Sequence, residues 1–474
     1  MRRLAYKDLL LWKESPLRKP LIVRGVRQCG KTYLIQQFGS ENYDGVAYFN
    51  FEHMPNLKDI FEGSIDPKRL ISQLSISSDV KIRPGSTLIF FDEIQECPRA
   101  LTSLKYFQEL APEYHIITAG SLLGIHLNSS KKEGDSGASK SFPVGKVSYL
   151  DLYPMDFEEF LMASGDEGMH DYLSAMDVHE QIPRFMIPML EDRLREYQVV
   201  GGMPAAVSAW IETHSLPDVR AVQSWILDTY HDDLAKHPVD YKGSLESVWE
   251  SIPMQLTKDN SRFIFGQSVK GARAADLESA VQWLKNAGMV GKVVQVEKPS
   301  IPLAMYAKTF YKLYMADVGL FSLRSGVPSD FLNSDPSYYK DFKGAMAESI
   351  VFQELNTHLG NDRFYWRSGG EAEVDFLVPM FYEPVPIEVK AGQAKSSKSL
   401  KVYREKYDPR VAVKTSMDPE TSIGRVTHIP LYMMWRVKDY VRAALESTGW
   451  VDPDEVFMRK HRPSTDIPAV QQSS

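Results

Sequence analysis

An eight-residue segment near the amino end constrains this chain more than any other feature. Residues 25–32, Gly-Val-Arg-Gln-Cys-Gly-Lys-Thr, fit the pattern G-x-x-x-x-G-K-[ST]. The β-branched run LIVRGV precedes the second half of the pattern, and KTYLIQQF continues from it with helical spacing. A strand, a glycine-containing loop and a helix in this order predict a loop whose backbone amides bind phosphate oxygens. A strand–helix turn that binds nothing is the alternative.

The chemistry of a bound nucleoside triphosphate explains the fixed positions of this loop. Gly25 and Gly30 permit backbone dihedrals and a close approach that a Cβ would block. Lys31 supplies a positive charge for the β- and γ-phosphates, and the Thr32 hydroxyl is suited to ligate Mg²⁺. The sequence therefore predicts ATP and Mg²⁺ as ligands. The other residues expected to contact the nucleotide are Arg27, Gln28, Cys29 and Tyr33.

Two further apolar runs end in polar residues that suit the same site. STLIFFDEI (86–94) is a candidate buried strand that ends in Asp92, predicted to support Mg²⁺, and Glu93, predicted to polarise the attacking water. Acids at a strand end also cap helices, which is the alternative. HIITAGS (115–121) places Ser121, and with it Thr118, as a sensor of the γ-phosphate, although hydroxyls in this position also form turns.

Strands alternate with helices over residues 1–160, and VAYFNFE (46–52) adds another strand. This alternation predicts an α/β fold with a parallel sheet covered on both faces. The polar, Gly/Ser-rich segment 128–141 is expected to be a mobile loop. Residues 161–240 are predicted to form a helical lid, in which the Gly-Gly-Met-Pro of VVGGMPAAV (199–207) is a turn between helices.

The segment 241–335 has a pattern typical of a winged-helix-like region. Leu277, Val281 and Leu284 share one helical face, Gly288 is a candidate C-cap, and the strand MVGKVVQV follows. Residues 336–445 are expected to form a small α/β domain, with a helix at 345–359 and strands at RFYWR, EVDFLVP and PIEVKAG. Residues 446–474 have the composition of a partly disordered extension.

Composition excludes several classes of protein. The pI near 5.9 argues against a generic nucleic-acid coat, although a local basic groove is compatible with it. Two cysteines, Cys29 and Cys97, make no disulfide framework, which favours a reducing cytoplasm. No run approaches the ~18 consecutive apolar residues of a membrane span. We therefore predict a cytoplasmic protein with no membrane partner.

Several motifs follow one another along most of the chain: RGVRQCGKT, LIFFDEIQ, TAGSLLG, YQVVGGMPAAV, KLYMADVGL and WRSGGEAEVDFLV…PIEVKAG. In this order they resemble a prokaryotic family of AAA-type (AAA+/STAND-like) P-loop ATPases with a C-terminal domain of unknown function related to PD-(D/E)XK nucleases. The resemblance implies nucleotide binding at Gly25, Gly30, Lys31, Thr32, Asp92 and Glu93. Cys29, and the absence of proline from the loop, depart from the family pattern. Relatives often form rings, so a homo-oligomer is compatible, but no residue pattern here requires one.

The nuclease-like motif consists of an acid followed by (D/E)-x-K on a neighbouring strand, with a Glu on a preceding helix. The matching residues are Asp375, Glu388, Lys390 and Glu348. Residues 388 and 390 leave the same face of a strand because side chains alternate. Converging carboxylates there would bind a second Mg²⁺ or Mn²⁺, and Lys390 would steady a developing anion. A half-exposed strand with ordinary surface charges is the alternative.

Three functions follow as hypotheses. The first is an Mg²⁺-dependent ATPase that moves a C-terminal, nuclease-like domain, with DNA as a candidate partner. The second is a metal-dependent DNA nuclease gated by ATP, and the third is a non-catalytic module in which ATP orders an interaction surface. Some histidines lack the sequence spacing that metal ligands usually have, so no metal site is expected at them. They are His170, His179, His214 and His231.

Overall fold

The computed structural model describes residues 1–120, 145–235, 239–258, 262–264, 274–328, 340–360, 363–392 and 397–453. The predicted sensor Ser121, the loop at 128–141 and most of the C-terminal extension lie outside them. The chain divides into two compact units. Unit 1 contains Met1–Ala175, Pro183–Gln295 and Lys308–Asp362, and unit 2 contains Met176–Ile182, Val296–Ala307 and Arg363–Ser474. The finer division into five domains stays a prediction.

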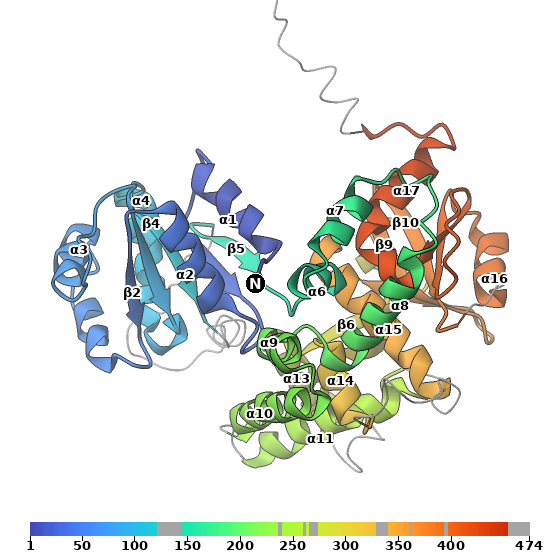
Figure 1. Ribbon diagram of the computed structural model, residues 1–474. Coiled ribbons are helices and arrows are strands. Elements are labelled where there is room, and N and C mark those ends of the chain that lie inside the picture. Colours follow the sequence, from blue (N-terminus) through green and yellow to red (C-terminus); the bar gives the residue numbers. More distant parts are fainter. Residues whose placement is uncertain are drawn as a thin grey trace, which may run out of the picture. The chain divides into compact units, whose positions relative to one another are not determined.

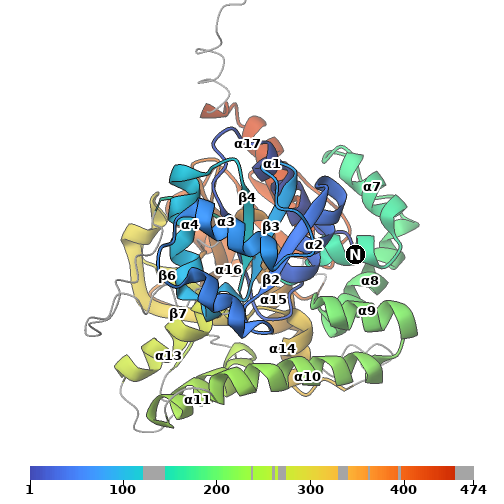
Figure 2. The same ribbon diagram turned by 90° about the vertical axis from the view of Figure 1, so that its left-hand side faces the viewer.

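The amino-terminal part of unit 1 is a five-stranded sheet in the order β2-β3-β4-β1-β5, in which all neighbouring strands are parallel. This confirms the predicted parallel α/β fold, and β5 is a strand that the sequence had not indicated. Helices lie on both sides of the sheet (Figures 1 and 2). The elements are α1 (Ala5–Glu14), β1 (Leu21–Arg24), α2 (Lys31–Asn42), β2 (Gly45–Asn50), η1 (Pro55–Phe61), α3 (Pro67–Ile76), β3 (Thr87–Asp92), η2 (Ile94–Glu96), α4 (Pro98–Leu110), β4 (His115–Ala119) and β5 (Ser148–Asp151).

Strand β3 is the centre of the apolar core, because every one of its residues is buried. The Phe91 ring contacts those of Phe49, Phe51 and Phe61, with ring centroids 5.7–5.9 Å apart. Edge-to-face and tilted aromatic pairs of this kind stabilise a core beyond the area that they bury. Packing around Phe91 therefore fixes the end of β3, where Asp92 lies.

Helices follow the sheet, as the sequence predicts. They are α6 (Phe157–Ala163), α7 (Glu167–Ala175), α8 (Met186–Val200), α9 (Pro204–Thr213), α10 (Leu216–Ala235), α11 (Val239–Leu256) and α13 (Ala274–Asn286). Helices α10 and α11 run side by side (Figures 1 and 2).

The Gly-Gly-Met-Pro segment connects α8 to α9, as predicted, but it is also a packing junction. A Cβ on Gly202 would lie 1.7 Å from the carbonyl oxygen of Met155, and one on Gly201 would lie 2.4 Å from Oδ1 of Asp317. Asp317 accepts hydrogen bonds from the backbone N–H groups of Gly202 (2.6 Å) and Leu320 (2.9 Å). Only glycine allows the three chain segments to approach this closely.

The rest of unit 1 contains β6 (Val290–Val296), β7 (Ala307–Met315), α14 (Val318–Arg324) and α15 (Lys340–Leu359). Leu277, Val281 and Leu284 are buried on α13, as predicted. Gly288 follows α13 with a φ of +74°, which suits its predicted place at a helix end. Strands β6 and β7 are neighbours in one sheet. The winged-helix assignment stays a prediction.

Unit 2 contains strands in the order β12-β11-β10-β9-β8. Strand β9 is antiparallel to β8 and β10, whereas β10, β11 and β12 are parallel. The three predicted strands correspond to β8, β9 and β10. The bounds are η3 (Leu303–Tyr306), β8 (Phe364–Arg367), β9 (Glu373–Met380), β10 (Glu383–Val389), α16 (Lys398–Tyr407), β11 (Ala412–Ser416), β12 (Val426–Pro430), η6 (Leu431–Arg436) and α17 (Val437–Glu446).

Among the described residues, no helix has both the length and the apolar character needed to cross a membrane.

Candidate nucleotide-binding site

The loop between β1 and α2 has the backbone of an anion site. Gly30 is the N-cap of α2, with a φ of +94°, and Gln28 also has a positive φ of 64°. No side chain caps this helix. The backbone N–H groups of Lys31 and Thr32 lie in the first helical turn, where no acceptor exists within the helix. These donors, together with the positive end of the helix dipole, suit the oxygens of a phosphate.

Lys31 is buried, with 7% of its surface exposed. Its Nζ donates to the carbonyl oxygens of Gly25 and Val26, both at 2.9 Å. The ammonium is therefore held within the loop by neutral acceptors. A phosphate oxygen would be a stronger partner, because charge-assisted hydrogen bonds are about twice as strong as neutral ones.

Asp92 lies beside the loop, where the predicted Mg²⁺ site requires a carboxylate. Its Oδ2 accepts from the Thr32 hydroxyl and from the Tyr48 hydroxyl, both at 3.0 Å, and its Oδ1 accepts from the Glu93 amide. Burial raises the pKa of Asp92, whereas the bonds from Tyr48 and Thr32 oppose that rise. A hydroxyl and a carboxylate 3.0 Å apart form an oxygen donor set that fits Mg²⁺.

Glu93 follows Asp92 in a left-handed conformation, with φ 48° and ψ 46°. Such a backbone is strained for a residue other than glycine and occurs preferentially at functional sites. Its Oε2 accepts from Nε2 of Gln95 at 2.5 Å. Glu93 is therefore oriented by its own turn, directly after the buried strand.

Thr118, the softer of the two predicted sensors, is fully buried on β4 between β1 and β3. It pairs in register with Ile22 and Phe91. Its hydroxyl oxygen makes no hydrogen bond with any described residue. An unsatisfied buried hydroxyl at this position fits a contact with a ligand or an ordered water.

The inner side of the loop is fixed by residues that sequence reasoning missed. The guanidinium of Arg3 donates to the carbonyl oxygens of Cys29 (2.8 Å) and Tyr153 (2.6 Å) and pairs with Glu159 at 3.0 Å. A Cβ on Gly25 would lie 2.2 Å from the carbonyl oxygen of Leu152, so this glycine is required by packing against the chain after β5. No local pattern around Arg3 distinguishes it from a solvated arginine.

The outer side of the loop contacts α10. Arg27 Nη1 lies 2.6 Å from Oδ1 of Asp233, and Gln28 Nε2 donates to the Thr229 hydroxyl at 3.2 Å. The Tyr230 hydroxyl donates to the Arg27 carbonyl at 3.1 Å. The structure therefore places the Arg27 and Gln28 side chains against a helix. Their predicted contact with nucleotide stays a prediction.

Tyr33 is 58% exposed and lies at the edge of a cavity of about 260 Å³. The residues that line the cavity are Met1, Arg3, Gly30, Tyr33, Pro204, Ala205 and Ser208. The cavity therefore adjoins the N-cap of α2 and the first turn of α9.

The second constellation is partly assembled in unit 2. The Oδ2 of Asp375 accepts from the Val389 amide at 2.8 Å, and Lys390 Nζ lies 2.7 Å from Oε1 of Glu388. Glu388 is 2% exposed, and its Oε2 makes no hydrogen bond among the described residues. Glu348 belongs to unit 1, where it accepts from Tyr314 (2.6 Å) and pairs with Lys312 (3.2 Å). A shared site with Glu348 stays a prediction.

Three family models match the chain. Residues 17–161 match an AAA domain, residues 191–330 match a domain of unknown function (DUF8612), and residues 343–433 match another (DUF4143). No curated protein matches the chain significantly.

Solved structures that resemble the chain are distant. A Walker-type ATPase of Pyrococcus abyssi is 14% identical over 68% of this chain and 95% of its own, with a TM-score of 0.41. The chain also matches the Orc1 protein of Aeropyrum pernix in complex with DNA, with 14% identity over 69% of this chain and 94% of that one and a TM-score of 0.31. A third match is AMPPCP-bound DnaA of Aquifex aeolicus, with 14% identity over 60% of this chain and 87% of that one and a TM-score of 0.27. With the loop, Asp92 and the parallel sheet in place, the family match over residues 17–161 identifies this part of the chain as an AAA-type P-loop ATPase domain.

Proposed function

We propose that the chain binds Mg²⁺–ATP at the loop 25–32 and hydrolyses it. The hydrogen bond between the Thr32 hydroxyl and the Asp92 carboxylate carries this proposal, because it joins two oxygen ligands at the N-terminus of α2. Lys31 and the backbone amides stabilise the charge of the phosphates. Thr32 and Asp92 would hold Mg²⁺, which neutralises charge that develops on the transferred phosphoryl group. Glu93 orients and polarises the attacking water.

The adenosine end of the nucleotide is assigned to the cavity beside Gly30 and Tyr33. This cavity adjoins the proposed phosphate site and contains the exposed Tyr33 ring, on which a base is able to stack. Pro204 and Ala205 of α9 also line it, so a bound base would touch the helical region.

Movement of the loop would reach α10 through Arg27, Gln28 and Tyr230. When a γ-phosphate binds, the Lys31 ammonium would leave the carbonyls of Gly25 and Val26. These carbonyls directly precede Arg27 and Gln28, so the conformation of the loop next to α10 would change. We infer that the nucleotide state is passed to the helices in this way. Movement of a DNA-binding C-terminal domain belongs to the same proposal.

The test is ATP turnover and nucleotide affinity of the full chain, with and without DNA. Lys31→Ala is expected to abolish turnover and weaken binding, while Lys7→Ala, an exposed lysine of α1, serves as the matched control. Glu93→Gln is expected to keep nucleotide binding and lose about 10²–10⁴-fold in turnover, the usual contribution of a general base. Wild-type turnover in Lys31→Ala refutes the proposal, and tight binding without turnover in the wild type favours a non-catalytic module.

A second candidate activity is metal-dependent cleavage of DNA by unit 2. It is favoured by the buried Oε2 of Glu388, which makes no hydrogen bond with the part of the chain that the structure describes. Lys390 pairs with the other oxygen of Glu388, and Asp375 binds the Val389 amide. A bound Mg²⁺ or Mn²⁺ would satisfy this oxygen and activate water. Incubation with linear DNA and Mn²⁺ tests the activity, and cleavage that persists in Asp375→Asn shows a contaminating nuclease.

A further inference from the structure

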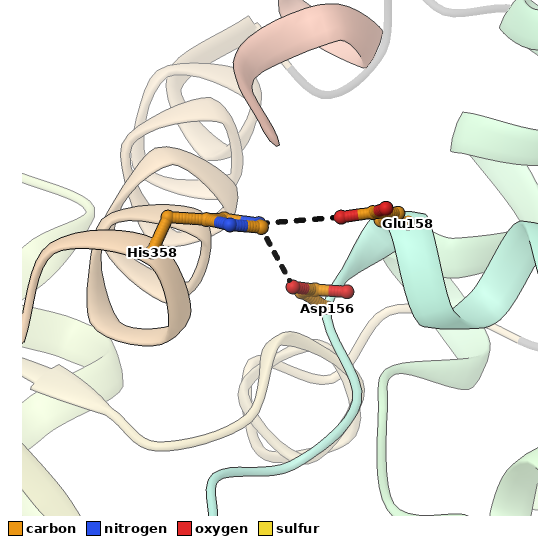
Figure 3. A group of neighbouring side chains, drawn as sticks. All are labelled: Asp156, Glu158 and His358. Atoms are coloured by element: carbon orange, nitrogen blue, oxygen red, sulfur yellow. Dashed lines mark ion pairs between the residues drawn. The ribbon is translucent and has the colours of Figure 1, made fainter. Parts of the chain in front are cut away.

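Four buried or nearly buried side chains of unit 1 converge between α6 and α15. They form the α6–α15 cluster, which consists of Asp156, Glu158, Glu354 and His358. Figure 3 shows three of them, with Asp156 and Glu158 at the start of α6 directed toward His358 on α15. The ligand atoms of these three lie within 4.8 Å of one another. Glu354 lies one helical turn before His358, on the same face of α15.

Each carboxylate in the cluster uses one oxygen to bind the protein. Asp156 Oδ1 accepts from the Glu159 amide at 2.8 Å, and Glu354 Oε1 accepts from the Phe157 amide at 2.8 Å. Glu158 Oε1 lies 2.8 Å from Nε2 of His170. These contacts orient the carboxylates in the way that outer-shell hydrogen bonds orient metal ligands.

The second oxygen of each carboxylate turns toward the imidazole of His358. Its Nε2 lies 3.0 Å from Asp156 Oδ2, 3.7 Å from Glu354 Oε2 and 3.8 Å from Glu158 Oε2. Asp156 Oδ2 and Glu354 Oε2 belong to side chains that are 0% and 1% exposed, and neither oxygen makes a hydrogen bond among the described residues. The same is true of His358 Nε2. Asp156 Oδ2 and Glu354 Oε2 therefore face the imidazole nitrogen without hydrogen bonds among the described residues, and Glu158 Oε2 faces the same nitrogen.

The cluster gathers more acidic than basic side chains in a largely buried position. The carboxylates of Asp156, Glu158 and Glu354 surround the imidazole of His358, and His170 contacts Glu158. Buried charges of one sign are costly unless they are paired or coordinate a metal.

The spacing of Asp156, Glu158 and His358 suits a metal with three protein ligands. Ligands about 2.0–2.2 Å from Zn²⁺ lie about 3.3–3.6 Å apart in a tetrahedron, and the contacts of His358 Nε2 with Asp156 (3.0 Å) and Glu158 (3.8 Å) bracket that value. Imidazole nitrogen together with carboxylate oxygen suits Zn²⁺ and similar transition cations better than Mg²⁺, which prefers six oxygen ligands and retains water. The side chains of Glu158 and His358 are 12% and 16% exposed, which leaves a route for the ion.

We propose that the α6–α15 cluster is a structural binding site for Zn²⁺ or a similar divalent transition metal. Asp156, Glu158 and His358 supply three ligands, and Glu354 Oε2 lies 3.7 Å from the same imidazole nitrogen. A water would complete the four-coordinate sphere. The metal joins the first turn of α6, near the end of the segment that matches an AAA domain, to the last turn of α15. The site is distinct from the proposed Mg²⁺ site at Thr32 and Asp92.

Zinc binding by the metal-stripped full chain tests the proposal. Zn²⁺ is titrated in competition with a chromophoric chelator, and excess Mg²⁺ is present to occupy the other acidic sites. We expect one tightly bound Zn²⁺ per wild-type chain and a higher melting temperature with Zn²⁺. His358→Gln removes a ligand and is expected to lose both effects. Asp156→Asn also weakens binding but keeps a side chain that caps α6.

Two controls distinguish this site from other zinc-binding groups. His231→Gln removes an exposed histidine that pairs with Glu246, and Glu388→Gln removes the buried acid of unit 2. Both are expected to retain the bound Zn²⁺. His170→Ala, which frees the outer oxygen of Glu158, is expected to weaken binding about 10–100-fold.

Either of two zinc-binding results overturns the proposal: no Zn²⁺ bound by the wild type, or His358→Gln with the affinity and stoichiometry of the wild type. Co²⁺ gives a measurement that needs no variant, in case His358→Gln fails to fold. The wild-type chain loaded with Co²⁺ is expected to show the intense visible absorption of a four-coordinate ion. Its absence also overturns the proposal.

Discussion

Arg3→Ala is the substitution that best tests how the nucleotide loop is held in place. The side chains of Arg3 and Glu159 are 5% and 2% exposed, and Nε of Arg3 lies 3.0 Å from Oε2 of Glu159. The other two guanidinium nitrogens donate to the carbonyl oxygens of Cys29 and Tyr153. One planar group thus joins α6, the chain after β5 and the loop itself. Lysine is unable to reproduce this fork of donors.

The expected cost follows from what the substitution leaves behind. Removal of one partner from a buried ion pair typically costs about 3–5 kcal/mol, because the other charge stays buried. For a unit larger than about 250 residues, such as unit 1, about 1 kcal/mol corresponds to about 1–2 °C in melting temperature. Arg3→Ala is therefore expected to lower the melting temperature of unit 1 by about 3–10 °C. Nucleotide affinity should fall as well, since the Cys29 carbonyl loses its donor.

Thermal unfolding and binding of a fluorescent ATP analogue are the assays. Arg2→Ala is the matched control, because Arg2 is exposed and a surface substitution usually changes stability by no more than about 0.5 kcal/mol. Arg3→Lys is expected to recover only part of the loss, and Arg3→Gln combined with Glu159→Gln should cost less than the sum of the two single changes. A melting temperature for Arg3→Ala equal to that of Arg2→Ala refutes the reasoning.

Two further predictions concern residues away from the loop. Gly202→Ala should lower the free energy of unfolding by at least about 3 kcal/mol, because the new Cβ meets the backbone of Met155, which no side-chain rotation relieves. Urea unfolding measures this loss. Gly168→Ala is the control, because a Cβ there meets nothing within 4 Å. Burial lowers the pKa of His115 to about 4. The unfolded chain takes up this proton near pH 6.5, so the contribution of His115 to stability is complete above pH 6.5 and is lost as the pH falls toward 4. Between pH 7 and 5, His115→Gln should therefore lose less stability than the wild type in urea unfolding; an equal loss contradicts the assignment.

The sequence was sufficient for features that depend on local pattern. The strands at LIVRGV, VAYFNFE, STLIFFDEI and HIITAGS form the parallel sheet, since buried strands are marked by continuous apolar runs. Gly30, Lys31 and Thr32 lie at the start of a helix because the motif specifies that geometry by itself. Strand β5 (SYLD) was not predicted from the sequence, because it is short and only partly buried and therefore lacks an apolar run.

Contacts between distant segments were not accessible from the sequence. Asp156 and Glu158 lie far from His358 in the sequence, and no spacing rule links ligands that α6 and α15 supply. His170 was expected not to be a metal ligand because it lacks ligand spacing along the chain, and in the structure it contacts Glu158. A search for metal ligands in a sequence depends on ligands that lie within one motif. The ligands of this cluster come from two helices that are far apart in the sequence.

The fixed and the variable positions of the loop 25–32 have different contacts in this chain. The fixed residues Gly30, Lys31 and Thr32 lie at the start of α2, whereas the variable residues before them contact the rest of unit 1. Arg27 pairs with Asp233 of α10, the Cys29 carbonyl binds Arg3, and a Cβ on Gly288 would lie 3.1 Å from the Val26 amide. If the loop binds ATP as proposed, a change at the phosphate site would reach three separate segments at once, and the variable positions would set which of them respond.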